Sequence, residues 1–189
     1  MRSLRLLPVT GTLVRRARPG CDNGGGVSAR EVESVVQEQS SVAEMIRSGI
    51  ERMPYNAMVG VRIVEMDGGR ARGTLAARPE VGNHVGTMHA GAQFSLIEAA
   101  SGAAVSSAFL DLLGRATPLA QGAEVTYRRP AKGDVVADAV LSPEEIARVR
   151  SELDAHGRAR FDVVVSVTDA DGTLATEATM RWYIRLNRS

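Results

Sequence analysis

The chain has 189 residues, of which 44% are hydrophobic, and its 23 basic and 22 acidic residues give a formal net charge of +1. This length accommodates one globular domain with a sizeable core and a tail, and the near-neutral charge without a long basic stripe argues against a nucleic-acid partner. The three histidines and single cysteine, at positions 84, 89, 156 and 21, lack metal-ligand spacing, and no G-x-S-x-G motif is present. The sequence therefore disfavours a zinc site and serine-hydrolase chemistry.

Residues 1–30 are rich in arginine, with six arginines and one acidic residue. This composition is typical of a disordered tail, or of upstream sequence included by an early start codon. A mitochondrial-type presequence is the alternative, although serine is sparse and the apolar patches are poorly periodic. Cys21 lies in this segment beside a glycine run and is expected to be inert. We expect a cytoplasmic protein, or a mitochondrial one if residues 1–30 are a presequence.

Apolar residues recur at roughly helical spacing from about Ala29 to Arg52. This pattern predicts one or two amphipathic helices. Pro54 ends the pattern, and the apolar period then changes to two. We therefore divide the chain into the leader 1–30, an amphipathic helical segment 31–53 and a main domain 54–189.

Alternating apolar residues predict two hairpins in the first part of the main domain. Residues 59–63 and 70–77 are separated by a glycine-containing turn, which predicts the first hairpin. Residues 123–127 and 135–141 flank a segment with proline and glycine, which predicts the second.

The last part of the chain contains a further helix and the clearest strand signal. Ser142 followed by proline and two acids is typical of a helix start, so we expect a helix to about His156 with Gly157 as its stop. Residues 161–167 and 174–186 alternate around an Asp-Ala-Asp-Gly turn and predict a third hairpin.

The run 88–110 is long, but its apolar content is mostly alanine and glycine, interrupted by polar residues. It is typical of a buried helix rather than a membrane span. A single antiparallel sheet has to bury its apolar face, and this helix is the only one apolar enough to be enclosed. The expected fold is α+β, with one curved six-stranded antiparallel sheet wrapped around a long central helix.

Glu98 is a lone carboxylate in the middle of this helix. Burying an unpaired carboxylate costs several kcal/mol, so Glu98 is exposed at an interface, paired, or kept for its reactivity. The helix start at His89, Ala90 and Gly91 offers free N–H groups and the positive end of the helix dipole, which would stabilise an oxyanion.

These two features cannot act on one substrate atom within one chain. At about 1.5 Å rise per residue, Glu98 lies roughly 12 Å along the axis from the Ala90 N–H. If two copies pack antiparallel about a two-fold axis, the helix start of one lies beside Glu98 of the other. The spacing predicts a homodimer with two equivalent sites, and it leaves a dimer of dimers open.

Three stretches are similar to a known family: NHVGTMHAGAQFSLIE (83–98), VTYRRPAKGD (125–134) and VTDADGTLATEATMRW (167–182). The chain resembles the hotdog-fold acyl-CoA thioesterases, especially the phenylacetic-acid-type (PaaI-like) branch and its uncharacterised DUF4442-like relatives, over about residues 50–187. The resemblance implies hydrolysis of an acyl-CoA or acyl-pantetheine thioester at a dimer interface. It implies no metal and no cofactor, because coenzyme A is part of the substrate.

The resemblance also implies roles for individual residues. Asn83 would orient the attacking water or the acid, and the N–H of Ala90, with that of Gly91, would polarise the thioester carbonyl. Glu98 of the other subunit would act as general base or nucleophile, and His89 would order the loop and helix start. This chain departs from the family where His-Ala-Gly replaces the frequent His-Gly-Gly and where glutamate replaces the aspartate common in this branch. The choice between base and nucleophile is therefore open.

Plainer explanations exist for each residue. Glu98 is equally explained by pairing with a cation of the partner chain, His89 by helix capping, and Asn83 by its turn. A further set has weaker grounds as substrate-binding residues: Arg128, Arg129 and Lys132 for the phosphates of coenzyme A, and Thr117 for a hydroxyl near the site. Solvated charges at a strand end explain the three cations as well.

Two other functions remain as alternatives to hydrolysis. A non-catalytic acyl-CoA-binding hotdog module would bind the same ligand without turnover. A hotdog dehydratase also uses a histidine and an acid, but the sequence contains no His-Phe-Pro-Gly-like segment.

Overall fold

The computed structural model describes residues 29–187, with side chains described from residue 41 onward. The leader, except for its last two residues, and Cys21 within it lie outside the described residues. The main elements are α1 (Ala29–Arg52), α2 (Pro54–Val59), β1 (Arg62–Asp67), β2 (Arg70–Leu75), α3 (Ala90–Ala108), β3 (Ala116–Tyr127), β4 (Val135–Val140), α4 (Pro143–His156), β5 (Arg158–Thr168) and β6 (Leu174–Leu186). Among the described residues, no helix has both the length and the apolar character needed to cross a membrane.

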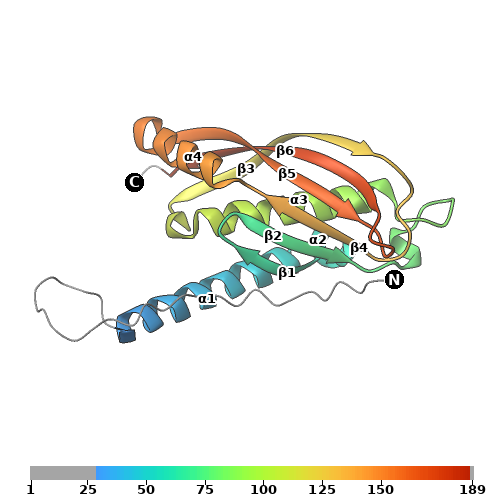
Figure 1. The fold of residues 1–189 in the computed structure, drawn as a ribbon, viewed down its shortest axis with the longest axis horizontal. Coiled ribbons are helices and arrows are strands. Elements are labelled where there is room, and N and C mark those ends of the chain that lie inside the picture. The colour runs from blue at the N-terminus through green and yellow to red at the C-terminus, as the bar shows by residue number, and fades with distance from the viewer. Residues whose placement is uncertain (1–28, 188–189) are drawn as a thin grey trace, which may run out of the picture.

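The six strands form one antiparallel sheet that curves around α3 (Figure 1). Their order is β1-β2-β4-β5-β6-β3. Thirteen of the nineteen residues of α3 are buried, and most of these are alanine or serine, so the sheet approaches the helix closely. The predicted architecture of a curved sheet wrapped around a central helix is confirmed.

The remaining six residues of α3 show where the sheet leaves the helix uncovered: Ala90, Gly91, Phe94, Glu98, Gly102 and Ser106. From Gly91 onward they follow one another at intervals of three or four residues, which places them on one face of the helix. We call the five residues from Gly91 to Ser106 the open stripe. Glu98 lies in the middle of the open stripe.

Two of the three predicted hairpins are confirmed, with β1 pairing β2 and β5 pairing β6. The first strand begins later than predicted because Val59 ends α2, and Gly60, with a φ of +86°, caps that helix. The predicted helix after Ser142 is also confirmed, since the Ser142 hydroxyl accepts the Glu145 N–H and Gly157 adopts the left-handed conformation.

The predicted hairpin of residues 123–127 with 135–141 is wrong. β3 pairs with β6, and β4 pairs with β2 and β5. The linker between them cannot make a tight turn, because its backbone bonds elsewhere: the Arg128 N–H donates to the Ala175 carbonyl and the Ala131 carbonyl accepts the Met88 N–H. It therefore crosses the end of the sheet instead of reversing the chain.

The two edges of the sheet differ in their protection. Along β1, α1 covers the edge, and the Glu51 carboxylate accepts the Ile63 N–H at 2.9 Å and a hydrogen bond from Arg62. On the other edge, β3 pairs only with β6 among the described strands. This twelve-residue strand therefore has one unpaired edge, which is a template for pairing with another chain.

Candidate active site

Glu98 lies half-buried on the open stripe. Its carboxylate forms neither an ion pair nor a hydrogen bond with any residue in the described part of the chain, and desolvation raises its pKa above the ordinary value for glutamate. It borders a cavity of about 260 Å³ and, among the described residues, is the only ionisable one that lines it. A half-buried acid without a counter-ion beside a cavity is a candidate for chemistry.

The cavity has walls from four parts of the chain. The residues that line it are Ile50, Met53 and Asn56 at the junction of α1 and α2, Glu98, Ala99, Gly102 and Ser106 on α3, Pro118, Leu119 and Ala120 on β3, and Trp182 on β6. Trp182 is oriented by its indole N–H, which donates to the Ser101 hydroxyl at 3.2 Å. Gly102 is needed for space, because a methyl group there would lie 3.3 Å from the Trp182 ring.

The start of α3 is shaped by His89, which occupies the N-cap position. Its Nδ1 accepts the Gly91 N–H at 2.9 Å, which places the ring proton on Nε2, and its own backbone N–H donates to Val81 at 2.8 Å. The Ala90 N–H has no acceptor in the described part of the chain. Of the two predicted oxyanion donors, Ala90 is therefore free in this chain, whereas Gly91 is engaged in the cap.

Asn83 lies in the loop that leads into α3 and is held by that loop. Its Oδ1 accepts the N–H groups of Val85 and Thr87, and its Nδ2 donates to the Thr87 hydroxyl at 2.9 Å. The loop borders a separate hollow of about 530 Å³, which Gly82, Asn83 and Thr87 help to line. Asn83 and Glu98 therefore face different hollows of the same chain.

The weaker candidates also lie away from Glu98. Arg128 pairs with Glu177, and Arg129 and Lys132 are exposed without an ion pair among the described residues. The Thr117 hydroxyl donates to Asn187 at 2.7 Å, and Thr117 is not among the residues that line the cavity. None of the four side chains joins Glu98 in its cavity.

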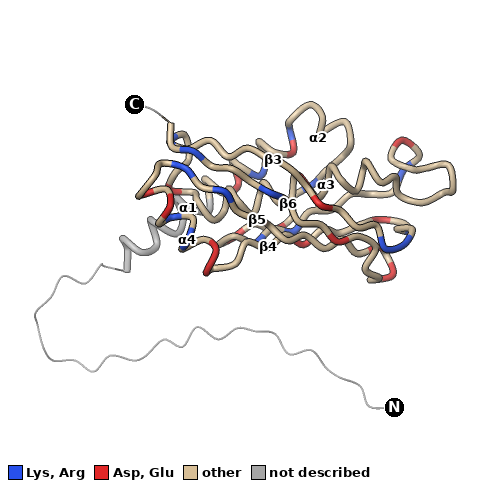
Figure 2. The backbone as a smooth tube through the Cα atoms, turned by 90° about the horizontal axis from the view of Figure 1, so that it is seen from above, with Lys and Arg blue, Asp and Glu red and all other residues tan. Residues whose placement is uncertain are grey.

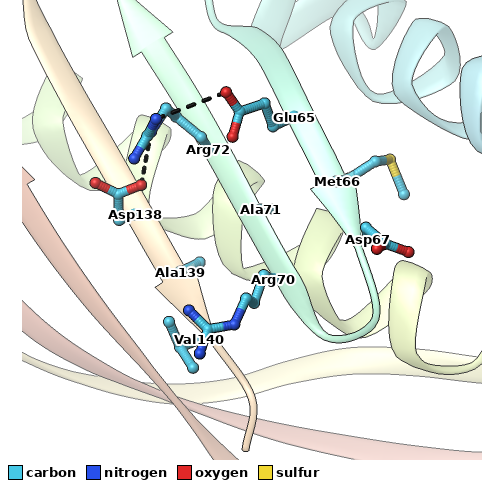
Figure 3. Close-up of a pocket in the computed structure, with 9 residues that line it drawn as sticks. All are labelled: Glu65, Met66, Asp67, Arg70, Ala71, Arg72, Asp138, Ala139 and Val140. Atoms are coloured by element: carbon cyan, nitrogen blue, oxygen red, sulfur yellow. Dashed lines mark hydrogen bonds and ion pairs between the residues drawn. The ribbon is translucent and has the colours of Figure 1, made fainter. Parts of the chain in front are cut away.

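Charged side chains elsewhere form other clusters. A hollow of about 390 Å³ over β1, β2 and β4 is bordered by Arg72, which binds Asp138 at 2.7 Å and lies 3.6 Å from Glu65 (Figure 3). Arg72 therefore offsets part of the negative charge of these two carboxylates. Basic residues also gather along β5 and β6, at the end of the molecule where the C-terminus of the chain lies (Figure 2). Among the side chains that the structure describes, from residue 41 onward, no three His, Cys, Asp or Glu residues converge as metal ligands do.

Sequence reasoning missed the junction of α1 and α2 as part of this site. Ile50 and Met53 lie in a pattern that predicts only an amphipathic helix, and Asn56 follows a proline and a tyrosine in no recognisable motif. Their contribution depends on how α1 and α2 pack on α3. No local spacing signals this packing.

Three comparisons place the chain among known proteins. A family model described as a domain of unknown function (DUF4442) matches residues 43–184. A Halobacterium salinarum protein named as a candidate esterase is 29% identical over 154 residues, which are 80% of this chain and 96% of that protein.

Solved structures support the same placement. PA5026 of Pseudomonas aeruginosa, described as a candidate thioesterase, has a TM-score of 0.68 at 28% identity, over 76% of this chain and 95% of its own. A Shewanella oneidensis protein, also described as a candidate thioesterase, has a TM-score of 0.61 at 16% identity, over 80% of this chain and 99% of its own. The fold shared with these structures is the hotdog fold.

Proposed function

Because the chain belongs to the DUF4442 family and has the hotdog fold, we propose that it hydrolyses the thioester of an acyl-CoA or acyl-pantetheine at a site between two copies of the chain. The observation that carries this proposal is Glu98, an unpaired carboxylate with a raised pKa beside a largely apolar cavity. The similarity to a candidate esterase and a candidate thioesterase supports hydrolysis as the reaction class.

The second copy is needed because the oxyanion donor and the acid are too far apart in one helix. Ala90 and Glu98 lie eight residues apart in α3, or roughly 12 Å along its axis. Phe94 lies halfway between them and is 38% exposed on the open stripe. A two-fold axis passing close to Phe94 would place Ala90 of each copy beside Glu98 of the other.

Other surfaces support this mode of association. β3 offers an unpaired strand edge beside the open stripe, and Leu119 and Tyr127 on β3 are 56% and 45% exposed. Pairing of two β3 edges would satisfy backbone groups that otherwise bond only to water, and it would cover these apolar side chains.

In the proposed reaction, the Ala90 N–H donates to the carbonyl oxygen of the thioester. Glu98 of the other copy removes a proton from water as the water oxygen attacks the carbonyl carbon. The tetrahedral intermediate then expels the thiolate of coenzyme A, which takes up the proton, and the acid product leaves. One oxyanion donor of this kind contributes about 3 kcal/mol to transition-state stabilisation.

Direct attack by the Glu98 carboxylate is the other route to the same products. A single turnover in ¹⁸O-labelled water separates the two routes. General-base catalysis labels only the released acid, whereas attack by Glu98 forms an anhydride, and its hydrolysis at the Glu98 carbon places label in the enzyme carboxylate, which is therefore diagnostic of this route.

The test of the proposed function is release of free thiol from short, medium and aryl acyl-CoAs by the purified chain. Glu98→Gln removes the base but keeps the shape, so we expect kcat to fall by about 10²-fold to 10⁴-fold. Glu152→Gln on α4, an exposed acid paired with Arg148, is the matched control and should keep activity. Saturable binding without turnover by the wild type would support the binding-module alternative, and full activity of Glu98→Gln would refute the mechanism.

A further inference from the structure

Asn56 presents an unusual buried amide to the cavity that Glu98 borders. Its side chain is only 5% exposed, and its Nδ2 donates to the Ile50 carbonyl at 2.9 Å. A carbonyl oxygen only accepts, so this bond fixes the nitrogen toward Ile50 and turns Oδ1 the other way. Oδ1 accepts no hydrogen bond from any residue in the described part of the chain.

Among the described residues, every fully buried side-chain nitrogen or oxygen has a hydrogen-bond partner, so this unpartnered oxygen of Asn56 must be reached by solvent. Asn56 and Glu98 line the same cavity, so two acceptor groups without protein partners face one largely apolar space. A molecule that donates two hydrogen bonds would satisfy both groups. Water is the smallest such donor.

The backbone around Asn56 holds it in place beside α3. The Tyr55 hydroxyl lies 3.2 Å from the hydroxyl of Ser95, which precedes Glu98 by one turn of α3. The Asn56 carbonyl accepts the N–H groups of Gly60 and Val61 at 2.8 and 3.0 Å. The contact of the Tyr55 hydroxyl with α3 and the hydrogen bonds to the Asn56 carbonyl therefore hold Asn56 in place beside α3.

We propose that Asn56 is a catalytic residue that holds the attacking water together with Glu98, an assignment that rests on the proposed thioester hydrolysis. The water donates one hydrogen bond to the Glu98 carboxylate and the other to Asn56 Oδ1. Both of its hydrogens are then engaged, and a lone pair is directed at the thioester carbon.

The electrons and protons balance in this arrangement. As the water oxygen bonds to the carbonyl carbon, one proton passes to Glu98 and the carbonyl electron pair moves onto the oxygen held by the Ala90 N–H. When the carbon–sulfur bond breaks, the thiolate takes that proton from Glu98. Asn56 accepts a hydrogen bond throughout and exchanges no proton.

Other polar groups near the cavity are less suitable. The Thr117 hydroxyl is engaged by Asn187 and does not line the cavity. Ser106 does line it, but it lies eight residues beyond Glu98, or about 12 Å along the helix axis. Of the polar side chains that line the cavity, Asn56 is thus the remaining candidate to share a water with Glu98.

The experiment compares Asn56→Leu, which removes the acceptor at similar size, with Asn56→Asp, which keeps an acceptor oxygen. We expect kcat to fall by up to about 10²-fold in Asn56→Leu, because the attacking water is no longer held in position. In Asn56→Asp, which keeps an acceptor oxygen, kcat should recover in part. In both variants the acid limb of the pH profile should move to higher pH, because the cavity becomes less polar or gains a negative charge. Val59→Ala is the matched control, since Val59 is a buried residue of α2 that does not line the cavity. It should lower stability without changing kcat or the acid limb.

A second measurement separates this inference from the proposed function. The pKa of Glu98 is followed directly by NMR of the ¹³C-labelled carboxyl group in the wild type and in the three variants. A wild type without turnover whose Glu98 pKa still rises in Asn56→Leu would refute the enzyme and support the shared water. An active wild type with unchanged kcat and unchanged Glu98 pKa in Asn56→Leu would keep the enzyme and overturn the role of Asn56. An equal loss of kcat in Val59→Ala would also overturn it.

Discussion

Replacing Ala90 by proline would delete the proposed oxyanion donor while leaving the fold in place. Ala90 is the first residue of α3, a position where proline is favoured because its missing N–H has no helical acceptor. The residue before a proline must be extended, and His89 already has φ of −63° and ψ of 138°. The Ala90 N–H bonds to no described residue, so no hydrogen bond of the folded chain is lost.

The two effects of this substitution differ in size. With the backbone already compatible and Ala90 exposed, the free energy of unfolding should change by no more than about 0.5 kcal/mol. Loss of one oxyanion donor lowers kcat by about 10²-fold to 10³-fold, equivalent to about 3 to 4 kcal/mol in the activation barrier. We therefore expect a large fall in kcat in a protein whose free energy of unfolding is nearly unchanged.

Thiol release from the acyl-CoA with the highest wild-type turnover measures the first effect, and urea denaturation measures the second. Ala90→Gly is the matched control: it keeps the N–H and removes only the methyl group, so its kcat should stay near that of the wild type. If Ala90→Pro folds normally and retains the wild-type kcat, the Ala90 N–H does not stabilise the oxyanion.

Four further outcomes are expected. Burial raises the pKa of Glu98 in the folded chain, so the acid limb of kcat/KM should lie above the ordinary range of a glutamate; an acid limb within that range would contradict this. The same raised pKa means that the folded state binds this proton more tightly than the unfolded state, so stability falls as pH rises through the folded pKa. Glu98→Gln should therefore be more stable than the wild type at neutral pH, with the difference disappearing in acid, as urea titrations at several pH values would measure. Phe94→Arg should place two like charges at the proposed two-fold axis and yield inactive monomers. A variant that is dimeric by light scattering and still releases thiol would exclude that axis. In Gly102→Ala the new methyl group would lie 3.3 Å from Trp182, and this crowding should offset the roughly 1 kcal/mol of unfolding free energy gained from helix propensity. The same methyl group should lower kcat/KM most for the bulkiest acyl groups. Gly49→Ala, with nothing within 4 Å of the new methyl, should show the stability gain alone, and identical acyl-chain profiles for both variants would argue against this cavity as the acyl site.

The fold was largely predictable because its main signals are local. The alternation at 161–167 and 174–186, and the cap at Ser142, each determine an element without reference to the rest of the chain. The pairing of β3 was not predictable from local spacing, because the residues between β3 and β4 include proline and glycine and so resemble a turn. Their backbone partners, Ala175 and Met88, lie far away in the sequence.

The candidate site was likewise predictable only in part. Glu98 was recognisable because a lone acid in an alanine-rich helix needs a reason, and the helix start was recognisable from its position. The engagement of the Gly91 N–H by His89 depends on a side-chain rotamer, which no spacing encodes. Asn56 was missed because its role arises from the packing of α2 against α3 and from one hydrogen bond to Ile50.

The junction of α1 and α2 has a practical consequence for anyone trimming this protein. A shortened chain beginning at Pro54 would keep every strand and α3, although the family match begins at residue 43. It would nevertheless lose Ile50 and Met53 from the wall of the Glu98 cavity, the anchor of the Asn56 amide, and the carboxylate of Glu51 that covers the β1 edge. Such a truncation should produce an aggregation-prone protein whose Glu98 cavity is open to water. The amphipathic segment is therefore best kept as part of the minimal functional unit.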